Sequence, residues 1–503
     1  MSGGGSRRMR AFERWMRFVG IEKSPSICIV DSGEEGIWIK ALRRLQEDDI
    51  IATIPKDACI SIKTTGAREL IEEAGLAGLL GLSFAVMYER SRGLDSPWAG
   101  YLQLMPGKEP VPIAWTVEEI DELLVGTELH KIVKEDKILV YEDWKENISP
   151  LIESKHWKLD PTFFCIEQYI SAKSLVGSRS FTIDDYHGSG MVPLADLFNH
   201  KTGCEDVHFT TVCSLTSSDD ENDDDIDRDD DHGGNEVVEE RLSPIDFITD
   251  DESSISDGNG KSSEDDPTKL EMIVVKDVEA GAEIFNTYGS MGNAALLHRY
   301  GFTEPDNPFD IINIDMHLIT QWSKTTSFSD RLFRRRVSLW RRLDFSGCIS
   351  QNSEYFEVTI DGIPQLELLV LLYIIFLTEE SYTKLDITTI SFKEIEIPAK
   401  LILLNKITAS SVPRAPQKDP EEFLHTENVC RALTNLADAR EVLYGLDSLE
   451  VDLNKLKDCC CVSEKKLFHS LVMRVSERTI LEKLRFYASQ FHRKKKRKSD
   501  ANQ

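Results

Sequence analysis

Short runs rich in β-branched residues, separated by glycine, aspartate and proline, mark the beginning of the chain. Four of them, SICIV, IWIKAL, DIIATIP and ACISI, occupy residues 27 to 62. Strands bounded by turn residues have this pattern, so we expect three or four short strands there. From about residue 66 to 175 the apolar positions recur at helical spacing, and Thr116 precedes Glu119 by three residues, as in a capping box. The pattern predicts a helical insert after a strand-rich start.

Strand and turn signals return after this insert, at SRSFTI, MVPLADLFNH and HFTTVCSL, and again at LEMIVVKDVEAGAEIFNTYG. The stretch between the last two, about 214 to 268, is rich in Ser, Asp, Glu and Gly. It has too few large apolar residues to offset its ordering entropy, so we expect it to be disordered. The flanking strands can still pair, because the cost of closing a loop rises slowly with its length.

Beyond about residue 310 the spacing is helical almost to the end of the chain. The most apolar run, LLVLLYIIFL at 368 to 377, is too short to cross a bilayer and predicts a buried helix. The patterns together predict an α+β protein without membrane segments. We expect one domain over 20–310, a mostly α-helical domain over 311–490 and a basic tail over 491–503.

Composition and charge narrow the class of protein. The 503 residues include ten cysteines but no CxxC pair, and the N-terminus lacks the apolar core of a signal peptide. We therefore expect a reduced, intracellular protein without structural zinc, and a monomer. The net charge of −28 argues against direct nucleic-acid binding. Two local extremes stand out: the acidic run DDENDDDIDRDDD (219–231) and the basic run RKKKRK (493–498).

Each charged run has two readings. The acidic run is either a solvated loop or a segment that steers basic target proteins towards the site. The basic run is typical of a nuclear-localisation signal or of a patch that contacts an acidic surface, and it favours the nucleus over the cytoplasm.

Candidate chemistry begins with PLADLFNH (193–200), which supplies Asp196, Asn199 and His200 after an apolar run. These residues could line a pocket, although Asp and Asn also commonly cap turns. His200 with Cys204 and His208 could suggest a metal, but no second pair of ligands with zinc spacing follows. Aromatic residues gather further on, and each alone reads as a core residue whose polar atom is satisfied; these are Tyr88, Trp98, Tyr101, Tyr288, Tyr300 and Phe302.

The joint pattern of these motifs resembles the SET-domain protein-lysine methyltransferases, in the branch of the Rubisco large-subunit and ribosomal-protein methyltransferases. RSFTIDDYHGSGMVPLADLFNH resembles the family's Arg-x-Phe segment followed by Asp-x-x-Asn-His. GAEIFNTYGSMGNAALLHRYGF resembles its Asn-x-Tyr-Gly and Tyr-Gly-Phe pair. The likeness is strong over 20–310 and weak over the helical C-terminal half.

This resemblance implies a SET β-fold with a helical insertion, followed by an α-helical substrate-binding domain. It also implies S-adenosylmethionine as the cofactor and Tyr288 as the catalytic residue. The cofactor-binding residues that it implies are Glu35, Gly36, Arg179, Asp196, Asn199, His200 and Tyr288. The substrate-binding residues that it implies are Trp98 and Tyr101 on the substrate face, Arg179, and Tyr300 with Phe302 in an aromatic channel. Tyr288 and Tyr300 would form two walls of that channel, joined by a short helix with Asn293 as its cap.

One position departs from the family pattern. The family's Gly-x-Gly turn corresponds to SGEEGIW, where Glu34 replaces the first glycine and Gly36 matches the second. A glycine lost from a close backbone approach leaves open a scaffold that binds lysine-containing partners without turnover. Methylation of histidine instead of lysine also stays open.

The residue types suit methyl transfer to an amine. The reaction is an in-line displacement, so the protein chiefly has to align the amine with the methyl group. A lysine must first lose its proton, and both an aromatic channel and a neighbouring sulfonium lower its pKa. No dedicated carboxylate base is then required. The favoured substrate is a non-histone protein, basic and most plausibly ribosomal.

Overall fold

The structure is a computed structural model that describes residues 7–33, 36–154, 156–211, 267–326, 329–345, 355–392, 395–408 and 421–500. The predicted disordered stretch therefore lies almost wholly outside the described residues. The chain forms two compact units. The first unit contains Met1–Trp115, Lys131–Ser290 and Leu297–Gly301; the second contains Thr116–His130, Met291–Leu296 and Phe302–Gln503. The units are thus interleaved in sequence and not divided at residue 310.

Three small sheets build the first unit, after the helix α1 (Arg7–Phe18). The largest has the order β1-β4-β9-β8 and contains β1 (Glu22–Lys23), β4 (Ile50–Pro55), β9 (Lys269–Val274) and β8 (Val207–Thr211). A hairpin is formed by β2 (Ile27–Asp31) and β3 (Ile37–Ala41). The third sheet has the order β5-β7-β6 and contains β5 (Ile60–Ser61), β7 (Gly188–Met191) and β6 (Ser180–Asp184). The strands expected between residues 27 and 62 are confirmed.

The two strands on either side of the acidic stretch are neighbours in the largest sheet. β8 and β9 run antiparallel, with Val207 opposite Val274 and Thr211 opposite Leu270. The two strands thus pair, as the sequence allowed, across more than fifty intervening residues. The sheet is therefore continuous from β9 to β8.

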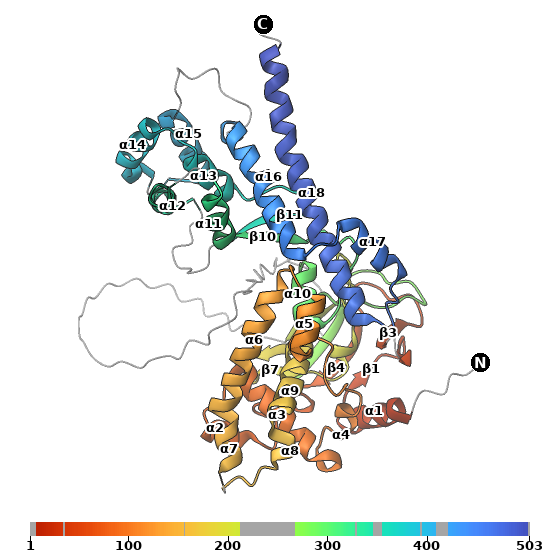
Figure 1. Cartoon of the computed structure of the whole chain (residues 1–503). Helices are drawn as coiled ribbons and strands as arrows, with labels where there is room; N and C mark the ends of the chain where they lie inside the picture. Colours follow the sequence, from red (N-terminus) through yellow and green to blue (C-terminus); the bar gives the residue numbers. More distant parts are fainter. Residues whose placement is uncertain are drawn as a thin grey trace, which may run out of the picture. The chain divides into compact units, whose positions relative to one another are not determined.

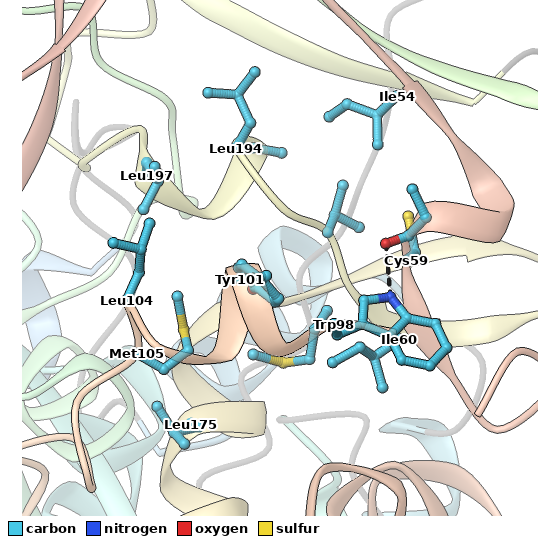
Figure 2. Close-up of a cluster of buried hydrophobic side chains, with 14 of the residues drawn as sticks. Ile54, Cys59, Ile60, Trp98, Tyr101, Leu104, Met105, Leu175, Leu194 and Leu197 are labelled. Atoms are coloured by element: carbon cyan, nitrogen blue, oxygen red, sulfur yellow. Dashed lines mark hydrogen bonds between the residues drawn. The ribbon is translucent and has the colours of Figure 1, made fainter. Parts of the chain in front are cut away.

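The helical insert is also present. It contains α2 (Arg68–Glu73), α3 (Gly78–Ser91), α4 (Ala99–Leu102), α5 (Val117–Leu123), α6 (Leu129–Asp143), α7 (Ser149–Glu153), α8 (Pro161–Phe164) and α9 (Ile166–Arg179). The predicted capping box starts α5: Glu119 N–H donates to Thr116 Oγ1 at 3.2 Å, and Thr116 N–H to Glu119 Oε2 at 2.9 Å. Figure 2 shows side chains of α4 and its flanks packed in the apolar core, with Leu175 of α9 and Leu194 nearby.

The second unit is mostly helical. After α10 (Asn293–Tyr300), which both units share, it contains α11 (Met316–Lys324), α12 (Asp330–Leu343), α13 (Leu366–Ile375), α14 (Glu379–Ile387), α15 (Ile397–Thr408), α16 (Glu427–Glu441), α17 (Leu449–Asp458) and α18 (Lys465–Asp500). Figure 1 shows α12 to α15 clustered together and α16 beside α18. Residues 493–498 of the basic run continue the backbone helix of α18.

α13 confirms the predicted buried helix, because most of its residues lie in the second core. Among the described residues, no helix is both long and apolar enough to cross a bilayer. A two-stranded antiparallel sheet of β10 (Ile311–Asp315) and β11 (Tyr355–Thr359) was missed in the predicted helical half. Five-residue strands are too short to stand out against neighbouring helical periodicity.

Candidate active site

The two motif segments of the first unit lie side by side. Asn286 N–H donates to Asn199 O at 2.9 Å, and Asn286 forms parallel bridges with His200 and Val207. The carbonyl of Phe285 accepts from the N–H groups of Asp206 and Val207. The backbone thus brings together FNH and FNTYG, which lie almost ninety residues apart in sequence.

Three aromatic rings form a row at this junction. The Tyr288 ring stacks on His200, with centroids 5.0 Å apart and planes 20° from parallel, and on Tyr300 at 4.4 Å and 29°. Tyr288 N–H also donates to His200 Nδ1 at 3.0 Å, which ties ring and backbone together. We call His200, Tyr288 and Tyr300 the aromatic wall. Because Tyr288 and Tyr300 are in contact, they form one wall and not two opposite walls, so that expectation is wrong.

The Tyr288 hydroxyl is anchored to backbone. It donates to Phe198 O at 3.2 Å. Burial raises the pKa of Tyr288 well above its usual value, although the charge of Arg179 opposes this. The phenol is therefore protonated at neutral pH and acts as a hydrogen-bonding group, not as a base.

A buried charged network accompanies the wall in the first unit. Arg179 Nε donates to Glu109 Oε1 at 2.5 Å, and its Nη1 lies 3.1 Å from Asp196 O and 3.4 Å from Asp196 Oδ2. Tyr101 Oη donates to the same Oδ2 at 2.9 Å. We call Tyr101, Glu109, Arg179 and Asp196 the Arg179 network. Sequence reasoning missed Glu109, because nothing in its local pattern distinguishes it from an ordinary charged residue.

Asp196 is the member of this network that is fully buried and incompletely hydrogen-bonded. Its side chain has no exposed surface, and Oδ1 has no hydrogen-bond partner. Burial raises the pKa of Asp196 to about 6, against the lowering effect of Arg179. For Arg179, burial lowers the pKa, but Glu109 and Asp196 outweigh it and keep the guanidinium charged. Leu194, two residues earlier, holds φ at +76°, a conformation that non-glycine residues adopt where the surrounding structure imposes it.

A second polar pair lies at the surface. Asn199 is exposed, and its Nδ2 donates to Glu283 Oε1 at 2.8 Å. An amide and a carboxylate at one place offer both a donor and an acceptor. That combination suits a zwitterionic amino-acid group.

The β2–β3 turn holds the glycine-containing motif. Glu34 and Glu35 lie outside the described residues. Gly36 adopts φ +103° and Gly33 φ +69°, both in the region that favours glycine, and a Cβ at either would meet no atom within 4 Å. Gly33 was missed because the family pattern directed attention to position 34. This part of the turn therefore has glycine at both described left-handed positions.

Trp98 and Tyr101 do not lie on a substrate face, which corrects that expectation. They are 5% and 0% exposed, and Trp98 Nε1 donates to Ala58 O at 2.9 Å (Figure 2). Large aromatic side chains with one polar atom fit a core when that atom finds a partner. Tyr101 still reaches the site region through its hydroxyl on Asp196.

Phe302 and Asn293 belong to the second unit. Phe302 is half-buried, and the channel role expected for it stays a prediction. Asn293 is not the cap of α10, because it is the first helical residue and its side chain bonds Glu304 O and Asp310 Oδ2. Asp310 Oδ1 accepts from Asn293 N–H and so satisfies the helix start from a distant position.

The metal alternative gains no support. His200 Nδ1 accepts from Tyr288 N–H, and His208 pairs with Glu205 at 3.2 Å. Within the described part of the chain, no group of three or more His, Cys, Asp or Glu side chains is arranged to hold a metal ion.

Comparison with known proteins gives relatives for most of the chain, although no family model matches it. Ribosomal lysine N-methyltransferase 3 of Saccharomyces cerevisiae is 25% identical over 377 residues, which is 65% of this chain and 67% of that protein. N-lysine methyltransferase setd6 of Xenopus tropicalis is 26% identical over 353 residues, 66% of this chain and 65% of the relative. The matched regions thus span about two thirds of these relatives.

Solved structures share the fold. Rubisco LSMT bound to AdoMet has a TM-score of 0.61 at 19% identity, over 97% of this chain and 92% of that one. Rubisco LSMT bound to sinefungin and monomethyllysine has a TM-score of 0.62 at 18% identity, with the same coverage. The α+β class and the family resemblance drawn from the motifs are therefore confirmed.

Proposed function

We propose that this chain is a SET-domain lysine methyltransferase, which transfers a methyl group from S-adenosylmethionine to the ε-amine of a lysine in a protein. The observation that carries the proposal is the aromatic wall, in which Tyr288 is held at its ring, its hydroxyl and its backbone N–H. A side chain held at three points can orient a reacting amine with little loss of freedom during the reaction.

The protein's own groups divide the remaining work. The wall removes water from a lysine ammonium and so lowers its pKa, which favours the neutral, nucleophilic amine. The Phe198 carbonyl and the protonated Tyr288 hydroxyl supply polar atoms beside the amine. The donor and acceptor of Asn199 and Glu283 fit the amino-acid end of S-adenosylmethionine, with His200 beside them. When bound, that molecule supplies an electrophilic methyl group on a sulfonium.

The proposed role of the Arg179 network is to position Arg179 at this site. Asp196 has no exposed side-chain surface, so we propose that Asp196 and Glu109 position Arg179 rather than touch the cofactor themselves. Arg179 keeps 23% of its side chain exposed and can still reach a ligand. By the family pattern, we propose that Glu35 and Gly36 also contact the cofactor.

Tyr288→Phe tests the assignment most directly. It removes one hydroxyl and keeps the stack, so transfer should fall by about two to three orders of magnitude while cofactor affinity is retained. Turnover is measured by methyl-label transfer and affinity by calorimetry. Tyr141→Phe, at a half-exposed tyrosine in the first unit, is the matched control and should keep full activity. Unchanged turnover in Tyr288→Phe would contradict the role of Tyr288.

The substrate we favour is a basic, non-histone protein, with a ribosomal protein first. The yeast relative carries ribosomal lysine methylation in its name, and the RKKKRK run supports a nuclear location. Methyl-label transfer into fractionated cell extract, followed by mass spectrometry, identifies the target. The same spectra separate lysine from histidine methylation. A fused reporter that stays cytoplasmic would remove the argument from RKKKRK.

The acidic run at 219–231 lies outside the described residues, and its steering role is a proposal from charge alone. Deleting residues 217–264 should raise the Michaelis constant for a basic peptide at low salt. An unchanged constant would exclude steering.

The competing function is a SET scaffold that binds lysine-containing partners without turnover. Glu34 motivates this scaffold hypothesis. Glycine at positions 33 and 36, by contrast, favours a turn whose backbone can still approach a ligand. Calorimetric titration with S-adenosylmethionine separates the two: saturable binding favours the enzyme, and absence of binding favours the scaffold.

A further inference from the structure

A stripe of arginines follows one face of α12 in the second unit. Arg331, Arg334, Arg335 and Arg342 are exposed, as is Ser338 between them. Spacings of three, four, seven and eleven residues place these side chains along one side of a helix. At 1.5 Å per residue the stripe extends for about 16 Å. Such a concentration of positive charge is unusual on a chain with a net charge of −28.

The stripe borders two cavities. One, of about 680 Å³, lies between α12 and α14 and is lined by these residues together with Asp330, Tyr382 and Asp386. The other, of about 400 Å³, lies between α11 and α12 and has a more apolar lining. Met316, Phe333 and Val337 supply that apolar lining, while Asp330 and Arg334 border both cavities. We call the two cavities together the α12 groove; Figure 1 shows the three helices in one cluster.

The arginines of the α12 groove are unequally satisfied. Arg335 pairs with Glu379 at 3.2 Å and lies over the Tyr382 ring at 4.8 Å, while Arg342 pairs with Asp386. The side chains of Arg331 and Arg334 make no hydrogen bond or ion pair with any described residue. Two exposed, adjacent guanidinium groups without internal partners are free to bind an external anion.

We propose that the α12 groove binds an acidic peptide segment of a partner protein, with an apolar residue of that segment in the smaller cavity. Guanidinium groups pair well with carboxylates, and Arg334, which borders both cavities, would hold an acidic residue next to the apolar one. A stripe of about 16 Å suits an extended segment of about five residues better than a single small anion.

The lining favours a peptide over a nucleic acid. Asp386 pairs with Arg342, whereas Asp330 can accept from the N–H groups of a peptide, which a phosphate backbone lacks. Tyr382 is only 3% exposed and is covered by Arg335 and Arg336, so it offers no face on which a base could stack. Lys324 and Arg341 also line the smaller cavity, but its apolar surface of Met316, Phe333 and Val337 suits a peptide side chain better than a sugar.

The test uses the full chain and the fluorescent peptide SSDDENDDDIDRDDDHG, which copies residues 217 to 233 and has Ile226 among its acidic residues. Fluorescence anisotropy should show binding that weakens as salt rises. Arg331→Glu with Arg334→Glu should weaken it at least about tenfold. Arg431→Glu with Lys457→Glu, at exposed positions of the same unit, changes the net charge equally and should have little effect. Replacing the peptide's Ile226 by Ser should weaken binding through the smaller cavity.

A second arm decides which acidic segment occupies the groove. In a full-length variant, the acidic residues at 219–231 are replaced by Asn and Gln. If this variant binds the peptide with the same affinity as the unmodified chain, the result supports a partner's segment as the occupant. Binding seen only in the variant would make the chain's own run the occupant and overturn the partner proposal. Binding that is lost equally in both double variants, or equal affinity for a single-stranded RNA of the same charge, would also overturn it.

Discussion

The two units each contain a buried charged network around a tyrosine. The networks differ in how completely their charged side chains are hydrogen-bonded. In the second unit, Tyr444 is surrounded by Arg440, Arg474 and Arg478, whose guanidinium carbons lie 5.0, 5.4 and 5.5 Å from the ring centroid. Asp452 pairs with Arg474 and Arg478, and Glu128 with Arg440. None of these charged or tyrosine side chains has a buried polar atom without a partner, although Asn313, which donates to Glu128, has one in its Oδ1. In the Arg179 network, by contrast, the charged side chain of Asp196 has no partner at Oδ1.

We infer that this difference distinguishes a structural network from the proposed functional one better than charge or titration does. Burial raises the pKa of Glu477 to about 8 in the second unit, helped by Glu128, and raises that of Asp196 to about 6 in the first. Perturbed carboxyl groups therefore occur in both. Only the Arg179 network combines an unsatisfied buried atom with a partly exposed arginine and a neighbouring positive-φ leucine. Functional sites tend to retain unsatisfied buried polar atoms and strained backbone, whereas structural cores tend to lack them.

Arg440→Leu should have the largest effect on stability. It leaves Glu128 without its cationic partner and the backbone carbonyl of Asn313 without the guanidinium donor, so the free energy of unfolding should fall by about 3–5 kcal/mol. Urea denaturation measures this loss, and methyl transfer per folded molecule should be unchanged. Arg431→Leu, exposed on the same helix, is the control. If the free energy of unfolding fell as little as in the control, the network around Tyr444 would not be structural.

Asp196→Asn should change stability in a pH-dependent way. Because the folded pKa is raised from 3.8 to about 6, the wild type loses stability as pH rises through this window, by about 3 kcal/mol in total. Asparagine cannot ionise, so the variant should gain relative to wild type between pH 4 and pH 6, and the difference should then level off. Methyl transfer should fall, since Arg179 loses a charged partner. Unfolding curves at several pH values check this, and a constant difference would contradict the burial of an ionised Asp196.

Glu109→Gln should have the smallest of these effects, a shift in the pH dependence of stability that Asp196 produces. Burial is the main cause of the raised pKa of Asp196, and the charge of Glu109 adds to it. Removing that charge should move the pH window of Asp196 downward by less than about one unit. Comparing the pH profiles of Glu109→Gln with and without Asp196→Asn isolates the coupling. If Glu109 were only a packing residue, the window would not move.

Local sequence determined much of the fold and part of the site. β-Branched runs bounded by turn residues predicted β2 to β5, and apolar spacing predicted the insert and α13, because these signals depend on neighbours in the chain. The slow growth of loop-closure entropy allowed β8 to pair with β9 but did not by itself predict the pairing. The FNH and NTYG motifs identified Tyr288 as the residue of interest, although a lone tyrosine would read as core.

Tertiary structure decided what these residues contact. Trp98 and Tyr101 became core residues, Tyr288 and Tyr300 became one wall, and Glu109 joined Arg179, although seventy residues separate the two in sequence. The side-chain types of α12 were visible in RLFRRRVSLWRRL, but whether each arginine finds a partner depends on α14 and its neighbours. Sequence pattern records periodicity and motif, whereas burial and pairing arise between segments far apart in the chain, so only the folded chain determines them.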